Sequence, residues 1–223
     1  IKNKDWSYHS YRDFEPESLI EASNQFIKEN LYVVRLGSKT KKKLSSKNKK
    51  IIDYPNTGLS DDFLDVFLAA NCKLYFGGDS GVNDIPLFFN KPVYLINCSL
   101  TLLKIYSEKF GKIFITKHLY SNKMKKYLSL REIFQSGLNG CSETHKFLDK
   151  DIKVVSNSSS ENLEFAKEVL DDINGKRLLT DEDIYLQKKF WSICKEFMPE
   201  VDFSNSNLNI GSNFLKKNFY LLD

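Results

Sequence analysis

The residues best suited to ligand chemistry lie in one short glycine-rich stretch. An apolar run that ends at Phe76 is followed by Gly77, Gly78, Asp79, Ser80 and Gly81. Where a strand ends in glycines and a serine before a helix, backbone N–H groups and a hydroxyl can bind phosphate. We interpret residues 77–81 as a phosphate-binding turn. The structural alternative is a tight connection whose glycines only allow a positive φ, since the stretch is neither a Walker loop nor a full dinucleotide fingerprint.

Polar residues also follow two earlier apolar runs. Ligands of an open parallel sheet bind beyond the carboxyl ends of its strands. Arg35 and Gly37 follow one run, and Asp53 and Tyr54 follow the next. A guanidinium combined with several backbone donors would hold a pyrophosphate, and Asn83, just beyond the glycine turn, is added to this binding set. The alternatives are a surface ion pair for Arg35, a turn carboxylate for Asp53 and a half-buried ring for Tyr54.

Further candidates lie near the start and in the middle of the chain. Arg12 could bind phosphate and Asp13 could position an acceptor hydroxyl, or the two could form an ion pair in a loop. Asp13 and Asp79 are the acids nearest the motifs, and hence the candidates for a catalytic base. Lys117 and His118 follow an apolar run, and either could approach a phosphate. The three histidines have no serine or cysteine in a triad-like context, so we expect them to be structural or exposed.

The composition indicates a folded, globular chain. It has 223 residues, of which 41% are hydrophobic. No run approaches the roughly 18 apolar residues of a membrane span, and the N-terminus does not resemble a signal peptide. The four cysteines lack metal-site spacing and are expected to be free core thiols in a reducing cytoplasm. We expect no metal ion and no cofactor, so any bound small molecule would be a substrate.

The net charge of +4 is unevenly distributed, because seven lysines fall within residues 39–50. We expect this lysine loop to be solvated surface. The alternative is an anionic sugar, a lipid phosphate or the inner face of a membrane. The cluster lacks interleaved aromatic residues, so nucleic acid is not an expected partner.

Helical and extended patterns alternate along the first half of the chain. Such alternation predicts a parallel sheet with right-handed crossovers, and hence an α/β, Rossmann-like fold whose sheet is flanked by helices. A helix capped by Ser60 is apolar on nearly every side and is predicted to be buried against the sheet. Strands are expected at residues 31–36, 51–54, 73–76 and 92–97. Helices are expected at 16–30, from residue 60 onward, and over a segment that includes residues 87–89.

The second half is less regular until residue 152. We expect a short strand at 112–116, a short helix at 128–134, an apolar strand at 152–155 and an irregular tail at 210–215. Ser158 and Glu161 form a capping box for a helix that ends at Gly175, and Thr180 begins another that Pro199 ends. We expect residues 1–175 to form one Rossmann-like domain and 176–223 a helical extension that packs back on it.

Short motifs follow one another in a fixed order over nearly the whole chain. They are Ser-Tyr-Arg-Asp at 10–13, Val-Val-Arg-Leu-Gly at 33–37, Ile-Asp-Tyr at 52–54, an aspartate-rich helix at 61–68, Gly-Gly-Asp-Ser-Gly at 77–81, Lys-Pro-Val at 91–93, Leu-Ser-Leu-Arg-Glu-Ile at 128–133, Val-Ser-Asn-Ser-Ser-Ser-Glu at 155–161 and Ile-Gly-Ser-Asn-Phe-Leu at 210–215. In this order the chain resembles a family of bacterial surface-polysaccharide glycosyltransferases.

The resemblance implies the C-terminal, nucleotide-sugar-binding half of a GT-B glycosyltransferase, with an acceptor-binding half preceding residue 1. It implies transfer of a sugar from a nucleotide-diphosphate sugar to a glycan acceptor, without a metal. Gly78, Ser80 and Gly81 would then hold the diphosphate, and Arg12 or Arg35 would stabilise the leaving phosphate. Pro86 departs from the expected pattern, because it falls where the helix after the turn should be running.

Two other functions are compatible with the residues. A nucleotide-sugar epimerase shares the two-half architecture and would need a carboxylate and a histidine facing the sugar. A non-catalytic phosphate- or nucleotide-binding module would use the lysine loop to dock to a membrane or partner. If the catalytic base lies in the preceding half, this chain would bind donor without turning it over.

Overall fold

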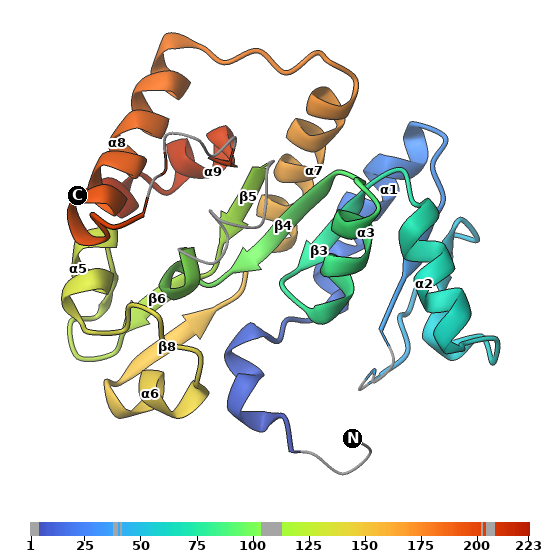
Figure 1. Ribbon diagram of the computed structural model, residues 1–223, viewed down its shortest axis with the longest axis horizontal. Helices are drawn as coiled ribbons and strands as arrows, with labels where there is room; N and C mark the ends of the chain where they lie inside the picture. The colour runs from blue at the N-terminus through green and yellow to red at the C-terminus, as the bar shows by residue number, and fades with distance from the viewer. Residues whose placement is uncertain (1–4, 38–39, 41, 104–112, 202, 204–207) are drawn as a thin grey trace.

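A four-stranded parallel sheet lies at the centre of the molecule (Figure 1). The computed structural model describes residues 5–37, 40, 42–103, 113–201, 203 and 208–223. The sheet order is β3 (Tyr75–Gly78), β4 (Val93–Cys98), β5 (Ile113–Thr116) and β9 (Asn209–Ile210). Every residue of β4 is buried, as expected for a parallel strand covered on both faces. The predicted α/β class with a Rossmann-like parallel sheet is confirmed.

Two smaller sheets accompany the central one. β1 (Val33–Arg35) and β2 (Ile51–Asp53) pair in parallel with each other. The strands predicted to form one sheet are therefore divided between two. A third, antiparallel sheet joins β6 (His118–Ser121) to β7 (Lys126–Tyr127) and β8 (Ile152–Val155). The strand at 152–155 was predicted, but the antiparallel partners were not.

The helices cover both faces of the central sheet. In chain order they are α1 (Ile20–Lys28), α2 (Asp62–Asn71), α3 (Asp84–Phe88), α5 (Leu130–Gln135), α6 (Thr144–Asp149), α7 (Ser159–Ile173), α8 (Asp181–Phe197) and α9 (Ser212–Lys217). Short 3-10 helices are η1 (Ser7–Arg12), η2 (Pro16–Leu19), η3 (Tyr54–Asn56), η4 (Gly81–Asn83), η5 (Leu100–Leu102) and η6 (Phe219–Leu222).

Aromatic contacts show which helices pack on which face. The ring of Phe76 on β3 lies 5.1 Å from that of Phe26 on α1 and 5.6 Å from that of Phe165 on α7. Phe114 on β5 points to the opposite face, where its ring lies 6.2 Å from that of Phe190 on α8. Since side chains alternate along strands, α1 and α7 cover one face and α8 the other.

The helix ends that have capping boxes were predicted correctly. Ser158 and Glu161 cap α7, and Gly175 follows it with a φ of 67°. Thr180 and Asp183 form the capping box of α8. The tail differs from the prediction, because it contributes the edge strand β9 and then α9 instead of an irregular segment.

Helix α2 departs from the prediction in two ways. Its N-cap is Asp61, whose carboxylate accepts a hydrogen bond from the Leu64 amide at 2.8 Å, not Ser60. It is also not buried: Phe63, Val66 and Phe67 are 73%, 43% and 50% exposed. The physical reason is that α2 packs against the short helix α3 and not against the central sheet, so only one side of it is covered.

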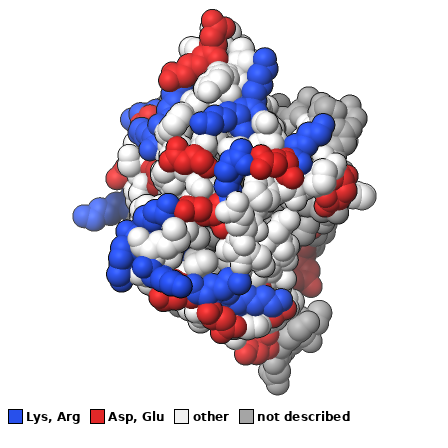
Figure 2. Space-filling model, turned by 90° about the vertical axis from the view of Figure 1, so that its left-hand side faces the viewer, with Lys and Arg blue, Asp and Glu red and all other residues white. Residues whose placement is uncertain are grey.

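The surface is charged but mixed in sign. Figure 2 shows basic and acidic side chains interspersed over the face that carries α5 and α8. All four cysteines are free, and three of them are buried, as predicted. In the part of the chain that the structure describes, no helix combines the length and apolar composition that crossing a bilayer requires.

Candidate functional site

A cleft of about 1300 Å³ lies between β1 and β3. Residues of both strands line it, as do α1 and the segment that connects η1 to η2. Its interior is largely apolar, with Phe26, Leu31, Val33, Leu74 and Phe76 among the lining residues. Charged and hydroxyl-bearing residues follow the carboxyl ends of the two strands. The volume exceeds that of a typical ligand pocket, which is roughly 300–1000 Å³.

Most of the predicted site residues meet at this cleft. The lining includes Arg12, Asp13, Arg35, Gly37, Gly77, Gly78, Asp79, Ser80 and Gly81. Asp53, Tyr54 and Asn83 are not among the lining residues. The cleft therefore brings together motifs that lie near residues 12, 35 and 79.

The glycine turn is held by its own side chains. The Ser80 amide donates to Oδ1 of Asn83 at 2.7 Å, and the Asn83 amide donates to the Ser80 carbonyl at 3.1 Å. The Ser80 amide, which we expected to face a phosphate, is therefore already hydrogen-bonded. Asn83, predicted to bind substrate, instead serves as the residue that closes the turn.

The glycines of β3 are explained by close contacts, not by backbone conformation. Neither Gly77 nor Gly78 has a positive φ. A Cβ at Gly77 would lie 2.8 Å from the Tyr75 hydroxyl, and one at Gly78 would lie 2.6 Å from Cε1 of Phe14. Gly81 is different, because it is exposed and a Cβ there would meet nothing within 4 Å.

The helix after the turn begins late, as Pro86 suggested. η4 comes first, and α3 follows with five residues, with Pro86 in its first turn. Helices this short have little macrodipole. The groups of this turn that a ligand could still contact are the exposed backbone at Gly81 and the Ser80 side chain. No long helix follows them to add a macrodipole.

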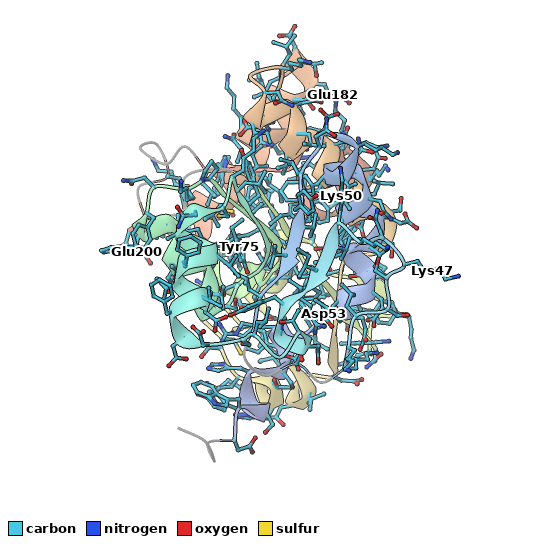
Figure 3. All side chains as sticks on the ribbon, turned by 90° about the vertical axis from the view of Figure 1, so that its right-hand side faces the viewer. Lys47, Lys50, Asp53, Tyr75, Glu182 and Glu200 are labelled. Atoms are coloured by element: carbon cyan, nitrogen blue, oxygen red, sulfur yellow. The ribbon has the colours of Figure 1, made fainter. Side chains whose placement is uncertain are left out.

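Arg35 is held by its own sheet. Its Nη1 donates to Oδ1 of Asp53 at 3.1 Å and to the Lys42 carbonyl at 3.0 Å. The parallel register places Arg35 opposite Asp53, whose other oxygen accepts from the Leu44 amide at 2.8 Å. Figure 3 shows Asp53 beside the β1–β2 pair, and Lys47 reaching out into solvent.

Tyr54 also acts within this small sheet. It is buried, and its hydroxyl accepts a hydrogen bond from the Asp61 amide at 3.1 Å. The contact joins η3 to the start of α2. Arg35 therefore forms an ion pair with Asp53, as its alternative proposed, but the pair is largely buried instead of lying on the surface, and the Tyr54 ring is buried instead of half-buried.

Arg12 is the arginine at the glycine turn. Its Nη1 lies 3.6 Å from Oδ2 of Asp79, and its side chain is 31% exposed. Phe14 packs against Gly78 from the same segment. The N-terminal segment thus lies over the carboxyl end of β3, with Arg12 paired to Asp79 and not to its neighbour Asp13.

A buried lysine lies at the carboxyl end of β5. Lys117 is 3% exposed, and its Nζ donates to the Asp13 carbonyl at 2.5 Å and to Oγ of Ser156 at 3.0 Å. Burial lowers the pKa of Lys117 to about 8, although the nearby Asp13 charge opposes this shift. Asp13 and Ser156 both line the cleft, so this cation lies just behind its wall.

Asn157 is a lining residue that sequence reasoning missed. Its amide and side chain exchange two 2.7 Å hydrogen bonds with Asn97, which lies near the end of β4 in a left-handed conformation with a φ of 54°. It also donates to the Thr116 carbonyl at 2.7 Å. The sequence feature that could have identified this pair is an asparagine near the end of each of two apolar runs, at 92–97 and 152–155.

The buried histidine belongs to a structural cluster outside the cleft. Nε2 of His118 donates to Glu161 at 2.9 Å, and Nδ1 lies 2.7 Å from the Tyr220 hydroxyl. Burial would raise the pKa of Glu161, but hydrogen bonds from His118 and Ser158 lower it to about 2. This cluster fixes the first turn of α7 against β6 and the C-terminal η6.

Among the described residues, no three His, Cys, Asp or Glu side chains come together as metal ligands would. Neither a family model, nor a curated protein, nor a solved structure matches this chain. A function must therefore be inferred from the cleft and from the order of the motifs.

Proposed function

We propose that the cleft between β1 and β3 binds a nucleotide-diphosphate sugar, and that the chain is the donor-binding part of a GT-B glycosyltransferase acting on a surface-polysaccharide acceptor. One observation carries the proposal. Residues from three separated motifs, represented by Arg12, Arg35 and Ser80, line a single cleft at the carboxyl ends of parallel strands. This is where ligands of open α/β sheets bind.

The cleft is lined by apolar residues in its interior and by charged and hydroxyl-bearing residues near the strand ends. This arrangement supports a ligand with an apolar part and an anionic part. The nucleoside would occupy the apolar interior near Val33 and Phe76, and the diphosphate would lie near the glycine turn. Arg12 can reach that position by exchanging Asp79 for a phosphate oxygen, because a guanidinium binds either group in the same geometry. Arg35 is not assigned this role, since Asp53 and the Lys42 carbonyl hold its guanidinium.

Lys117 would act on the diphosphate through its charge. Its ammonium is buried behind Asp13 and Ser156, where the low dielectric makes a cation more effective than at the surface. When the nucleotide leaves, negative charge develops on its terminal phosphate. Arg12 and Lys117 would stabilise that charge, and such stabilisation lowers the barrier to transfer.

A non-catalytic nucleotide-binding module is the second candidate. It is favoured by the ion pair of one of the two candidate bases, because Asp79 is bound to Arg12, which leaves Asp13 as the other candidate in the lining. A general base needs a carboxylate within reach of the acceptor hydroxyl. The epimerase alternative needs a carboxylate and a histidine facing the sugar. The His118–Glu161 pair lies outside the cleft, whereas His9 and Asp13 both line it, and Nδ1 of His9 lies 3.0 Å from the Ser142 carbonyl.

Calorimetric titration with UDP, GDP and CMP tests the proposal. One nucleotide should bind, and Arg12→Ala should weaken its binding about tenfold or more, as expected for loss of a charge-assisted contact. Arg131→Ala is the matched control, because Arg131 pairs with Glu196 on the surface and does not line the cleft. The proposal fails if no nucleotide binds or if the two variants behave alike.

A turnover assay then separates the candidate functions. The sugar nucleotide matching the bound nucleotide is incubated with the chain, and with a full-length protein that includes an acceptor-binding half. Release of nucleotide supports the transferase, and recovery of an epimeric sugar nucleotide supports the epimerase. Binding with neither product in both proteins supports the module.

A further inference from the structure

Exposed aromatic side chains lie on α2 and α3, two helices that pack against each other, with α2 at the right-hand edge of Figure 1. Phe63, Val66 and Phe67 follow one another at helical spacing on α2, and the rings of Phe63 and Phe67 stack at 6.0 Å. On α3 the exposed rings are Phe88, which is 82% exposed, and Phe89. Single exposed apolar residues are ordinary, but apolar groups gathered on one face mark an interaction surface.

The two ends of this face carry opposite charge. Asp61 and Asp62 lie at the start of α2, and Asp84 begins α3. Lys73 and Lys91 follow the ends of the same two helices.

The two lysines lie at the same end of the face. Burial raises the pKa of the Cys72 thiol, and the Lys91 charge is close enough to oppose that shift. Since Lys73 is the next residue in the chain, the C-terminal ends of α2 and α3 lie near each other. The face is therefore acidic at one end, aromatic in the middle and basic at the other end.

We infer that this face binds a second copy of the chain, in a two-fold arrangement in which the paired α2 helices run antiparallel. A two-fold axis through the aromatic middle places the acidic end of one copy against the basic end of the other. Aromatic side chains then meet aromatic side chains, and the charges are complementary at both ends. An anionic membrane is a poorer fit, because Asp61, Asp62 and Asp84 would face its phosphates.

Sedimentation velocity across the micromolar concentration range tests the pairing. The 223-residue chain should show a reversible monomer–dimer equilibrium. Val66→Glu should raise the dissociation constant about tenfold or more, because Val66 lies midway along α2 and the change places a charge in the apolar centre. Leu178→Glu is the control, since Leu178 is 88% exposed but lies between α7 and α8. A monomeric wild type, or equal effects of the two variants, would overturn the inference.

A charge-swap experiment tests the antiparallel arrangement itself. Asp62→Lys alone and Lys73→Glu alone each place like charges opposite one another at both ends of the pair, so each variant should dimerise about tenfold more weakly than wild type. Mixing the two variants should restore dimers, because every end then meets an opposite charge. Circular dichroism checks that both variants are folded.

Two outcomes of these experiments would reject a second copy as the occupant. One is a mixture of the two charge variants that stays as weakly associated as its components. The other is a wild type that remains monomeric but co-sediments with anionic lipid vesicles.

Discussion

Arg12 and Asp79 face each other at the carboxyl end of β3, with Nη1 and Oδ2 3.6 Å apart. The pair joins the N-terminal segment to the glycine turn. A phosphate group at this position would compete with Asp79 for Arg12. The strength of nucleotide binding should therefore depend on both partners, in opposite directions.

Asp79→Asn should strengthen nucleotide binding by about threefold to tenfold, because it removes a carboxylate that competes for Arg12 and repels phosphate. Titration calorimetry at low salt measures the effect, and added salt should reduce it. Loss of binding in Asp79→Asn would mean that the carboxylate contacts the ligand directly. That result would contradict the assigned role of Arg12.

Lys117 should make stability depend on pH above neutrality. Its pKa is about 8 in the folded chain and about 10.5 when unfolded. The unfolded chain therefore binds more protons between these values, so the folded state gains stability as pH rises through them. Relative to Lys117→Met, the wild type should gain about 2 kcal/mol between pH 7 and pH 10. Urea unfolding at several pH values measures this, and parallel stability curves would contradict it.

Glu161 should contribute to acid sensitivity. Its pKa is about 2 in the folded chain against an ordinary value of 4.5. Because the folded value is depressed, the contribution is complete above about pH 4.5 and is lost as pH falls towards 2. Glu161→Gln should lower the free energy of unfolding by about 2 kcal/mol at pH 7 and have little effect near pH 2.

The matched control for Glu161 lies on the same helix. Glu164 pairs with Lys167 on the surface, and such pairs contribute about 0–1 kcal/mol. Glu164→Gln should therefore leave stability nearly unchanged at both pH values. Equal losses in the two variants would show that the His118 cluster has no special role.

Gly78→Ala should destabilise the fold by about 1–3 kcal/mol, because the new Cβ would lie 2.6 Å from the ring of Phe14. In a Phe14→Ala background the same change should cost much less, since the obstructing ring is gone. Gly81→Ala should be tolerated, because its Cβ meets nothing within 4 Å and its φ is not positive. Thermal unfolding of the four variants measures the coupling. A Gly78→Ala cost that persists without Phe14 would place the constraint in the backbone.

Features set by neighbouring residues could be predicted from the sequence. The capping box of Ser158 and Glu161 needs only residues three positions apart, and α7 begins where this spacing places it. The apolar run of β4 likewise identifies a buried parallel strand. These elements carry enough local information to define their type and approximate ends.

Features that depend on distant residues could not be predicted. The sequence shows that Arg35 and Asp53 each follow an apolar run, but not that parallel register would pair them. Lys117 is buried because Asp13, 104 positions earlier, lies over it. The apolar residues on nearly every side of α2 predicted burial, whereas the structure leaves it exposed because it packs against the short helix α3 and not against the central sheet. For Gly77 and Gly78, the sequence suggests unusual backbone angles where the structure has close side-chain contacts.

The division of the parallel strands into a pair and a group of four has a mechanical consequence. With the cleft between them, β1 and β2 form a flap whose inner edge bonds to neither β3 nor β4. Tilting this flap would break no ladder of hydrogen bonds to the main sheet, but it would strain the bonds from Asn48 to Asn24 on α1 and from Lys42 to Glu15. A molecule bound in the cleft would contact both the flap and the main sheet. Binding would therefore change the tilt of the flap and, with it, the tilt of the outer helix α2.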